Sequence, residues 1–235
     1  MFSPVVQTSK TYNFNPSGGE IIQTAFDRIQ VRPTEITPTQ MQRAVLEMNL
    51  ALVKFNNQQP NLWTVDLQSV PLVQGSATYS VPAETTMILD MFIRYGNPPI
   101  DRYIQQISRT EYAAISTKMA PGFPSQFWFD RLISPTITFY LVPDGSFPYT
   151  AYYYRVRQIQ DATITGGYNI EVIYRFLDAL IADLAHRLAR VYKPEAEQQR
   201  KMDRDEAWTI AATQDVEAVP LYLYPGLNGY SGIKG

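Results

Sequence analysis

The sequence predicts an α+β protein in which a bundle of about four helices is interrupted by a β-rich insert and followed by an extended C-terminal arm. Apolar residues recur at helical spacing near both ends of the chain, whereas the middle consists of short β-branched and aromatic runs cut by proline and glycine. The last 17 residues carry leucines and tyrosines together with prolines and glycines that oppose a helix. We therefore expect N-terminal helices in 1–61, an insert in 62–166, C-terminal helices in 167–215 and an arm in 216–235.

Two capping boxes mark the first two helices. Ser17 and Glu20 have the spacing at which each side chain satisfies the other's backbone donor, and Thr37 and Gln40 repeat it with a proline at the first helical position. The apolar face of the first helix consists of Ile21, Ile22, Ala25, Phe26 and Ile29. The second helix carries Met41, Ala44, Val45, Met48, Leu52 and Phe55, and Leu46, Leu50 and Val53 widen this face. We therefore expect the second helix to be buried on two sides and to end near Asn57.

Seven runs rich in β-branched and aromatic residues predict strands in the insert. They are residues 62–72, 76–82, 87–95, 100–108, 125–132, 135–142 and 149–159. Ser108 and Glu111 form a third capping box, which predicts a short helix over residues 109–119. The triplet Tyr152, Tyr153 and Tyr154 must place aromatic rings on both faces of its strand, so we expect one face to meet a neighbour.

Two further helices follow the insert. Asn169 can cap a helix whose apolar stripe continues to Pro194, and the next helix covers residues 194–214. This last helix is mostly charged, with Met202, Trp208 and Ile210 as its few large apolar residues. We expect it to be solvated over most of its surface or to face a polar channel.

The composition argues against an enzyme, a metal site and a membrane segment. The net charge of -2 provides no overall positive field, and the absence of cysteine removes thiolate nucleophiles and cysteine-based zinc sites. The single histidine, His186, lies among leucines and is expected to be structural. A hydrolase that pairs Asp130 with Asp144 stays open, because a sequence does not give their separation in space. We expect no cofactor, no metal, no export and no membrane insertion, and synthesis in a cytoplasm.

A group of cations surrounds the junction of the last two helices. Acidic residues are interleaved with them, so one interpretation is an ordinary solvated surface. The other is that a ring of copies places these cations around DNA, where weak phosphate contacts add up without reading the sequence. The candidate DNA-channel residues are Arg190, Lys193, Arg200, Lys201 and Arg204.

The insert also carries many aromatic residues, among them Trp128 and Tyr152. They could form a stacking platform for a sugar or for single-stranded nucleic acid. Alternating aromatic residues on strands are more often the core of a small sheet.

The stretch RTEYAAISTKMAPGFPSQFWFDRLISPTITFYLVPDG, residues 109–145, resembles the head-to-tail adaptor proteins of short-tailed bacteriophages. The pattern is an acid and a tyrosine, an apolar residue, a lysine, G-x-P, aromatic residues followed by D-R, and a strand ending P-D. These are Glu111, Tyr112, Ile115, Lys118, Gly122, Pro124, Phe127 to Phe129, Asp130, Arg131 and the strand from Thr136 to Val142 before Pro143 and Asp144. The segments LEMNLALVKF and YSVPAETTMILDMF extend the resemblance.

The resemblance implies a non-enzymatic virion protein that assembles as a homo-oligomeric ring of about twelve subunits beneath the portal. The ring would extend the channel for double-stranded DNA, help to retain the genome and dock the tail or nozzle proteins. A helical bundle would form its body, the β-rich insert would project outward, and the C-terminal arm would reach the portal protein. Two alternatives stay open: another ring component of a tail or baseplate, and a glycan-binding module of a tail structure.

The C-terminal segment is the part of the sequence that most needs a partner. Ordering 17 residues costs about 17 to 34 kcal/mol in backbone entropy, and we do not expect the subunit's own covered helices to offset this cost. Alternating leucine and tyrosine favour an extended strand that docks in a groove. We expect a portal-binding arm, with a frayed terminus as the alternative. Its residues are Val219, Leu221, Tyr222, Leu223, Tyr224, Pro225, Leu227 and Tyr230.

Overall fold

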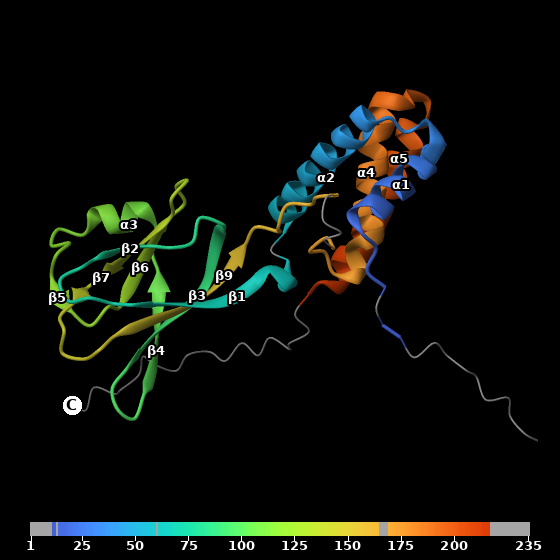
Figure 1. The fold of residues 1–235 in the computed structure, drawn as a ribbon. Coiled ribbons are helices and arrows are strands. Elements are labelled where there is room, and N and C mark those ends of the chain that lie inside the picture. The colour runs from blue at the N-terminus through green and yellow to red at the C-terminus, as the bar shows by residue number, and fades with distance from the viewer. Residues whose placement is uncertain (1–10, 13, 60, 165–168, 217–235) are drawn as a thin grey trace, which may run out of the picture.

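The protein consists of a helical bundle joined at one end to a curled β-sheet (Figure 1). The structure is a computed structural model that describes residues 11–12, 14–59, 61–164 and 169–216. The bundle is built from the chain before and after the sheet, so the α+β class and the interrupted bundle are confirmed. The four bundle helices are α1 (Gly18–Arg28), α2 (Pro38–Gln58), α4 (Leu177–Tyr192) and α5 (Glu197–Gln214).

Helix α4 is the central element of the bundle and packs against the other three helices. The capping boxes of α1 and α2 form as expected, with the Ser17 and Thr37 side chains accepting from the third helical residue. The five apolar residues expected on α1 are all buried, and Leu180, Leu184 and Leu188 of α4 are fully buried against them. The repeating apolar spacing of these helices therefore produces one continuous core.

An aromatic cluster closes the end of the bundle that faces the sheet. The ring of Phe55 on α2 lies 4.8 Å from Trp208 on α5 and 6.1 Å from Phe176, and Trp63 lies 4.8 Å from Phe176 (ring centroids). Phe176 belongs to the 3₁₀ turn η3 (Tyr174–Phe176), and Trp63 belongs to η2 (Leu62–Thr64). The inner faces of α2 and α5 therefore meet through this cluster.

The expectation that α2 is buried on two sides is wrong for the isolated chain. Leu46, Leu50 and Val53 are 57%, 46% and 48% exposed, whereas Met48 and Phe55 on the opposite side are buried. The bundle covers only one side of α2, because α1 and α4 both pack against its inner face.

The helix that was expected to begin at Asn169 begins at Leu177. Asn169 instead forms an isolated antiparallel bridge with Ser17, so its backbone is engaged outside a helix. Ile170 and Val172 follow in non-helical conformation and are buried in the bundle core. Burial of this irregular segment overrides the helical spacing, and η3 then leads into α4.

Nine strands form the β region, seven of them in one sheet of order β1-β9-β3-β4-β6-β7-β2. Strand β9 lies antiparallel between β1 and β3, and β4 pairs with β6 in parallel. Strands β5 and β8 form a separate parallel pair. The strands are β1 (Val65–Pro71), β2 (Thr78–Ser80), β3 (Thr85–Tyr95), β4 (Ile100–Gln106), β5 (Pro121–Gly122), β6 (Gln126–Asp130), β7 (Thr136–Tyr140), β8 (Val142–Pro143) and β9 (Thr150–Arg157).

The sheet encloses a second hydrophobic core, separate from that of the bundle. Phe127, Phe139 and Tyr153 are buried in it, and Tyr154 faces the opposite side with 41% of its surface exposed. The tyrosine triplet therefore does place aromatic rings on both faces of β9.

The short helix α3 (Arg109–Ala114) is shorter than the expected 109–119. The Lys118 ammonium donates to the carbonyl oxygens of Ala113 (3.0 Å) and Ile115 (2.7 Å). Because the lysine satisfies carbonyl groups that a further turn would use, the chain leaves the helix after Ala114.

Candidate assembly surfaces

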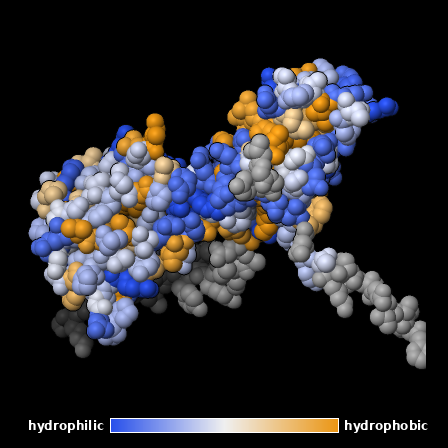
Figure 2. Space-filling view, in the orientation of Figure 1, coloured by the Kyte–Doolittle hydropathy of each residue, from blue (hydrophilic) through white to orange (hydrophobic). Residues whose placement is uncertain are grey.

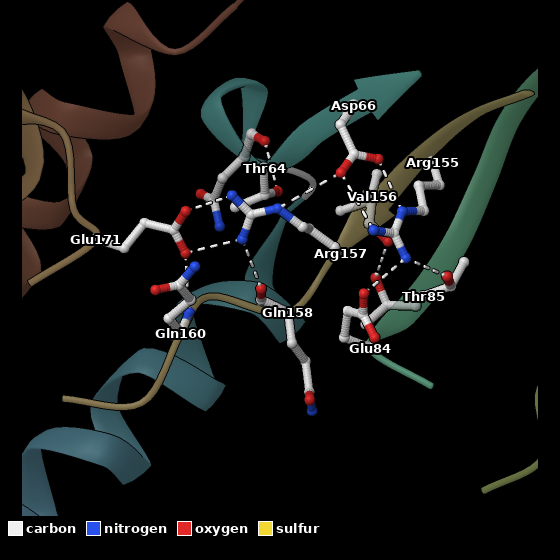
Figure 3. Close-up of polar contacts among 12 residues, drawn as sticks. Thr64, Asp66, Glu84, Thr85, Arg155, Val156, Arg157, Gln158, Gln160 and Glu171 are labelled. Carbon is white, nitrogen blue, oxygen red and sulfur yellow. Dashed lines mark hydrogen bonds and ion pairs between the residues drawn. The ribbon is translucent and has the colours of Figure 1, made fainter. Parts of the chain in front are cut away.

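A charged junction ties the sheet to the bundle (Figure 3). Arg155 and Arg157 lie two residues apart on β9 and therefore project from the same face of the strand. The Arg155 side chain is only 4% exposed and donates to both oxygens of Asp66, at 2.7 and 3.2 Å. It also donates to the Thr85 hydroxyl at 2.8 Å and lies 3.1 Å from the Glu84 carboxylate. This arginine joins β9 to β1 and to the start of β3.

Arg157 extends the junction to the bundle. Its guanidinium pairs with both carboxylate oxygens of Glu171, one of them at 2.8 Å, and lies 3.7 Å from Asp66. Glu171 belongs to the segment that leads into η3 and α4, and it also accepts from the Gln160 backbone at 3.0 Å. The pKa of Glu171 is lowered chiefly by the hydrogen bond from Arg157. The ionised pair therefore holds the end of β9 against the entry to α4.

A second polar contact supports the same junction. The Asn49 side chain on α2 donates to the Ala162 carbonyl at 3.1 Å and accepts from the Ala162 N–H at 2.7 Å. The surface over the junction is strongly hydrophilic in Figure 2.

The sequence interpretation missed this site. The sequence does hold one sign of it, the two arginines two residues apart in TAYYYRVR, because two cations on one face of a strand need acidic partners there.

Three of the five candidate DNA-channel residues have no close ion pair in the described part of the chain. Arg190 is near the end of α4, and its side chain is 65% exposed with only a 3.9 Å contact to Glu197. Lys193 lies between α4 and α5, and Lys201 is exposed on α5. Within the described ranges, neither lysine has a carboxylate partner. These three cations can therefore contact a phosphate without first losing a close ion pair.

The other two candidate DNA-channel residues, Arg200 and Arg204, already form close ion pairs. Arg200 lies 3.0 Å from Asp203, and Arg204 donates to Asp205 at 2.9 Å (Nε to Oδ1). Arg204 Nη1 also lies 3.2 Å from His186 Nδ1. Because arginine can only donate, Nδ1 accepts and the imidazole is neutral. All five cations gather at the α4–α5 hairpin, but Arg200 and Arg204 serve the bundle's own structure.

A buried carboxylate lies beneath this hairpin. Asp183 on α4 is 1% exposed and accepts from Lys54 of α2 at 2.6 Å and from Arg187 at 2.8 Å. Burial opposes ionisation of Asp183, but the hydrogen bonds from Lys54 and Arg187 outweigh it and lower the pKa. The cluster joins α2 to α4 through charge as well as through apolar packing.

The outer face of the sheet carries an aromatic stack that is covered by an arginine. Phe92 on β3 and Tyr152 on β9 stack with ring centroids 5.3 Å apart, and the Arg94 guanidinium lies 4.6 Å from the Tyr152 centroid. Asp101 holds that guanidinium through two hydrogen bonds of 2.7 Å. Trp128 is also paired, because it stacks on Tyr112 at 5.3 Å. Both features reduce the free aromatic surface that a sugar would require.

His186 and Asp144, two of the three residues considered for catalysis, have structural partners. His186 is 6% exposed, and its pKa is lowered by burial and by the charge of Arg204. Asp144 accepts from the Ser146 N–H at 3.0 Å and from the Tyr149 hydroxyl at 2.9 Å, as a turn residue does. In the described part of the chain, no group of three or more histidine or acidic side chains could hold a metal ion. None of the helices described here has the length and apolar character to span a membrane.

The candidate portal-binding arm, from Val219 to Tyr230, lies outside the described residues. Its point of departure is described. Asp215, directly after α5, is buried and accepts from Arg175 at 2.7 Å and from the Leu62 N–H at 3.2 Å. The chain therefore leaves the bundle from a fixed position beside η2, where the sheet begins.

The fold and these surfaces define an α+β protein whose distinctive features are contact surfaces rather than a catalytic constellation. A family model described as SU10 adaptor protein matches residues 16–224, which covers both the bundle and the sheet. The chain belongs to this family and is a bacteriophage head-to-tail adaptor, a structural component of the virion from a family that is typically non-enzymatic. Among curated proteins, none matches the chain.

Proposed function

We propose that this adaptor forms a closed ring of about twelve copies beneath the portal, where it extends the DNA exit channel and docks the tail. The match of residues 16–224 to the adaptor family is the observation that carries the proposal. The partners are the portal protein on one side, tail or nozzle proteins on the other, and further copies of this chain around the ring. Packaged double-stranded DNA passes through without being read.

We assign a separate task to each region. The bundle forms the body of the ring, and the sheet projects from it in an orientation fixed by Arg157 with Glu171 and by Asn49 of α2. The arm reaches the portal from the fixed exit at Asp215. Helping to retain the genome falls to Arg190, Lys193 and Lys201, the candidate cations without a close ion pair, through contacts that depend on salt and not on sequence.

A reconstitution with purified portal rings tests this assignment. The full chain is expected to co-sediment with portal as a complex of defined mass. Truncation after Ala218 is expected to abolish attachment, because it removes the leucine and tyrosine residues of the arm. Truncation after Tyr230 is the matched control and should leave attachment intact. Attachment by the shorter chain would contradict the portal-binding arm, and absence of the protein from purified virions would contradict the function as a whole.

A ring component of the tail or baseplate is the second candidate, and cross-linking in virions separates the two. Cross-links to portal support the adaptor position, whereas cross-links only to other tail proteins support the alternative. A glycan-binding module gains no support from the geometry, because Trp128 is stacked on Tyr112 and the Phe92–Tyr152 pair is covered by Arg94.

A further inference from the structure

The outer face of α2 carries an exposed apolar stripe that consists of Leu46, Leu50 and Val53. At about 100° per residue, Leu46, Leu50 and Val53 lie on the side of the helix opposite Met48 and Phe55, which face the core. Figure 2 shows apolar surface over the part of the bundle that α2 occupies in Figure 1. Three branched aliphatic side chains along one helix face are typical of a surface that another helix covers.

A second outer face in the same bundle has matching chemistry. Met202 and Ile210 of α5 are 61% and 60% exposed, and the face on which they lie is turned away from Trp208, whose ring faces α2. Glu206 lies between them on the same face and is exposed. On α2, Arg43 borders the apolar stripe with 51% of its side chain exposed and only a 3.7 Å contact to Glu47. Each face therefore combines large apolar side chains with an exposed charge, Arg43 on α2 and Glu206 on α5, and these two charges are opposite.

The two faces point away from each other. Phe55 and Trp208 stand on the inner faces of α2 and α5, and their ring centroids are 4.8 Å apart. The outer faces therefore lie on opposite sides of the bundle and cannot meet within one subunit. Two different faces of one subunit that fit each other make a head-to-tail contact, which closes into a ring when the rotation allows it.

We infer that the outer face of α2, from Leu46 to Val53, packs against the outer face of α5, from Met202 to Ile210, on the next copy of the chain. This inference rests on the ring proposed above and names the surfaces that hold it together. Arg43 of one copy lies near Glu206 of the next. Specific stable interfaces bury roughly 1,200 to 2,000 Å² in total. Five apolar side chains form only the centre of such an area, so we expect free copies to be monomeric and to associate on the portal.

Substitution at the centre of the stripe tests the contact. Leu50→Asp is expected to reduce ring formation on portal at least tenfold while leaving the circular dichroism spectrum and the melting temperature close to those of the unaltered protein. Leu89→Asp is the matched control, because Leu89 is 41% exposed on the sheet and the chemical change is the same. Ring formation by Leu50→Asp at the level of Leu89→Asp would overturn the inference.

Cross-linking identifies what lies on the stripe. The chain contains no cysteine, so single cysteines react without background. Copies with Leu50→Cys are mixed with copies with Glu206→Cys, assembled on portal and treated with a short bis-maleimide. We expect a dimer that contains one copy of each variant. Dimers of Leu50→Cys copies alone, or rings that yield no mixed dimer, would overturn the inference while leaving the ring intact. If the unaltered chain forms no ring on portal, the proposed function fails as well.

Discussion

The Phe92–Tyr152 stack on the sheet and the outer face of α2 differ in whether their apolar side chains are covered by the same chain. The sheet stacks Phe92 on Tyr152 and covers the pair with Arg94, which Asp101 holds in place. The bundle leaves Leu46, Leu50 and Val53 of α2 without such a cover. An aromatic pair that is covered by its own chain can stand in solvent, whereas the uncovered aliphatic face of α2 offers a surface to another chain. The difference supports our proposal that the bundle carries the contacts between subunits.

The largest expected effect is the difference in free energy of unfolding between substitutions on the two faces of α2. Phe55→Ala should lower the free energy of unfolding by roughly 3 to 5 kcal/mol, because Phe55 is 1% exposed and its removal leaves a cavity among Phe176 and Trp208. Leu50→Ala should change it by no more than about 0.5 kcal/mol, because Leu50 is already 46% exposed. Urea unfolding followed by circular dichroism measures both. A large loss for Leu50→Ala would mean that the stripe is covered within the monomer.

The next effect compares a buried charge of the bundle with an exposed charge of the sheet. Asp183→Asn should destabilise the protein by about 3 kcal/mol, since Lys54 and Arg187 lose their shared carboxylate in a water-poor site. The same substitution at Asp101, whose partner Arg94 is solvated, should produce no resolvable change. Thermal melting of the two variants side by side makes this comparison. Equal losses would remove the distinction between the two regions.

A smaller loss of stability is expected on acidification, and it arises from His186 in the bundle. The pKa of His186 in the folded protein is below its ordinary value of 6.5, so the unfolded chain binds the proton more readily. The stabilising contribution is therefore complete above pH 6.5 and is lost as the pH falls below it. His186→Gln should flatten the melting temperature between pH 7 and pH 5. If the melting temperature of the variant fell as steeply with pH as that of the unaltered protein, the loss of stability would come from other groups.

The smallest effect concerns the cover of the aromatic stack. Arg94→Ala should expose Phe92 and Tyr152 and increase the fluorescence of an apolar dye such as 8-anilinonaphthalene-1-sulfonate, with little change in melting temperature. Arg109→Ala, at an exposed position of α3, controls for the loss of a positive charge. Unchanged dye binding would show that the arginine does not shield the stack.

Local signals predicted the fold well where they agreed with burial. Ser17, Thr37 and Ser108 each begin a helix by the expected capping box, and the runs of β-branched residues became strands. The helix expected at Asn169 failed because Ile170 and Val172 are buried in a non-helical segment that Asn169 and Ser17 tie together. Tertiary packing of this kind leaves no trace in helical periodicity.

The contact surfaces were harder to predict than the fold. The residues at helical spacing on α2 were found, but their pattern does not say whether the second side is covered by the same chain or by another. The cations of the α4–α5 hairpin were also found. The pairs Arg200–Asp203 and Arg204–Asp205 lie within α5 at local spacing, whereas the contact of Arg204 with His186 depends on how α4 and α5 pack. The junction of Arg157 with Glu171 joins residues on either side of a loop, so no local pattern predicts it.

A reconstruction of the virion neck by electron microscopy, with this chain traced, tests the account most directly. We expect a closed ring beneath the portal in which Leu50 of each copy lies against α5 of the next copy. A neck that lacks this chain, or a ring in which Leu46, Leu50 and Val53 face solvent, would contradict the account.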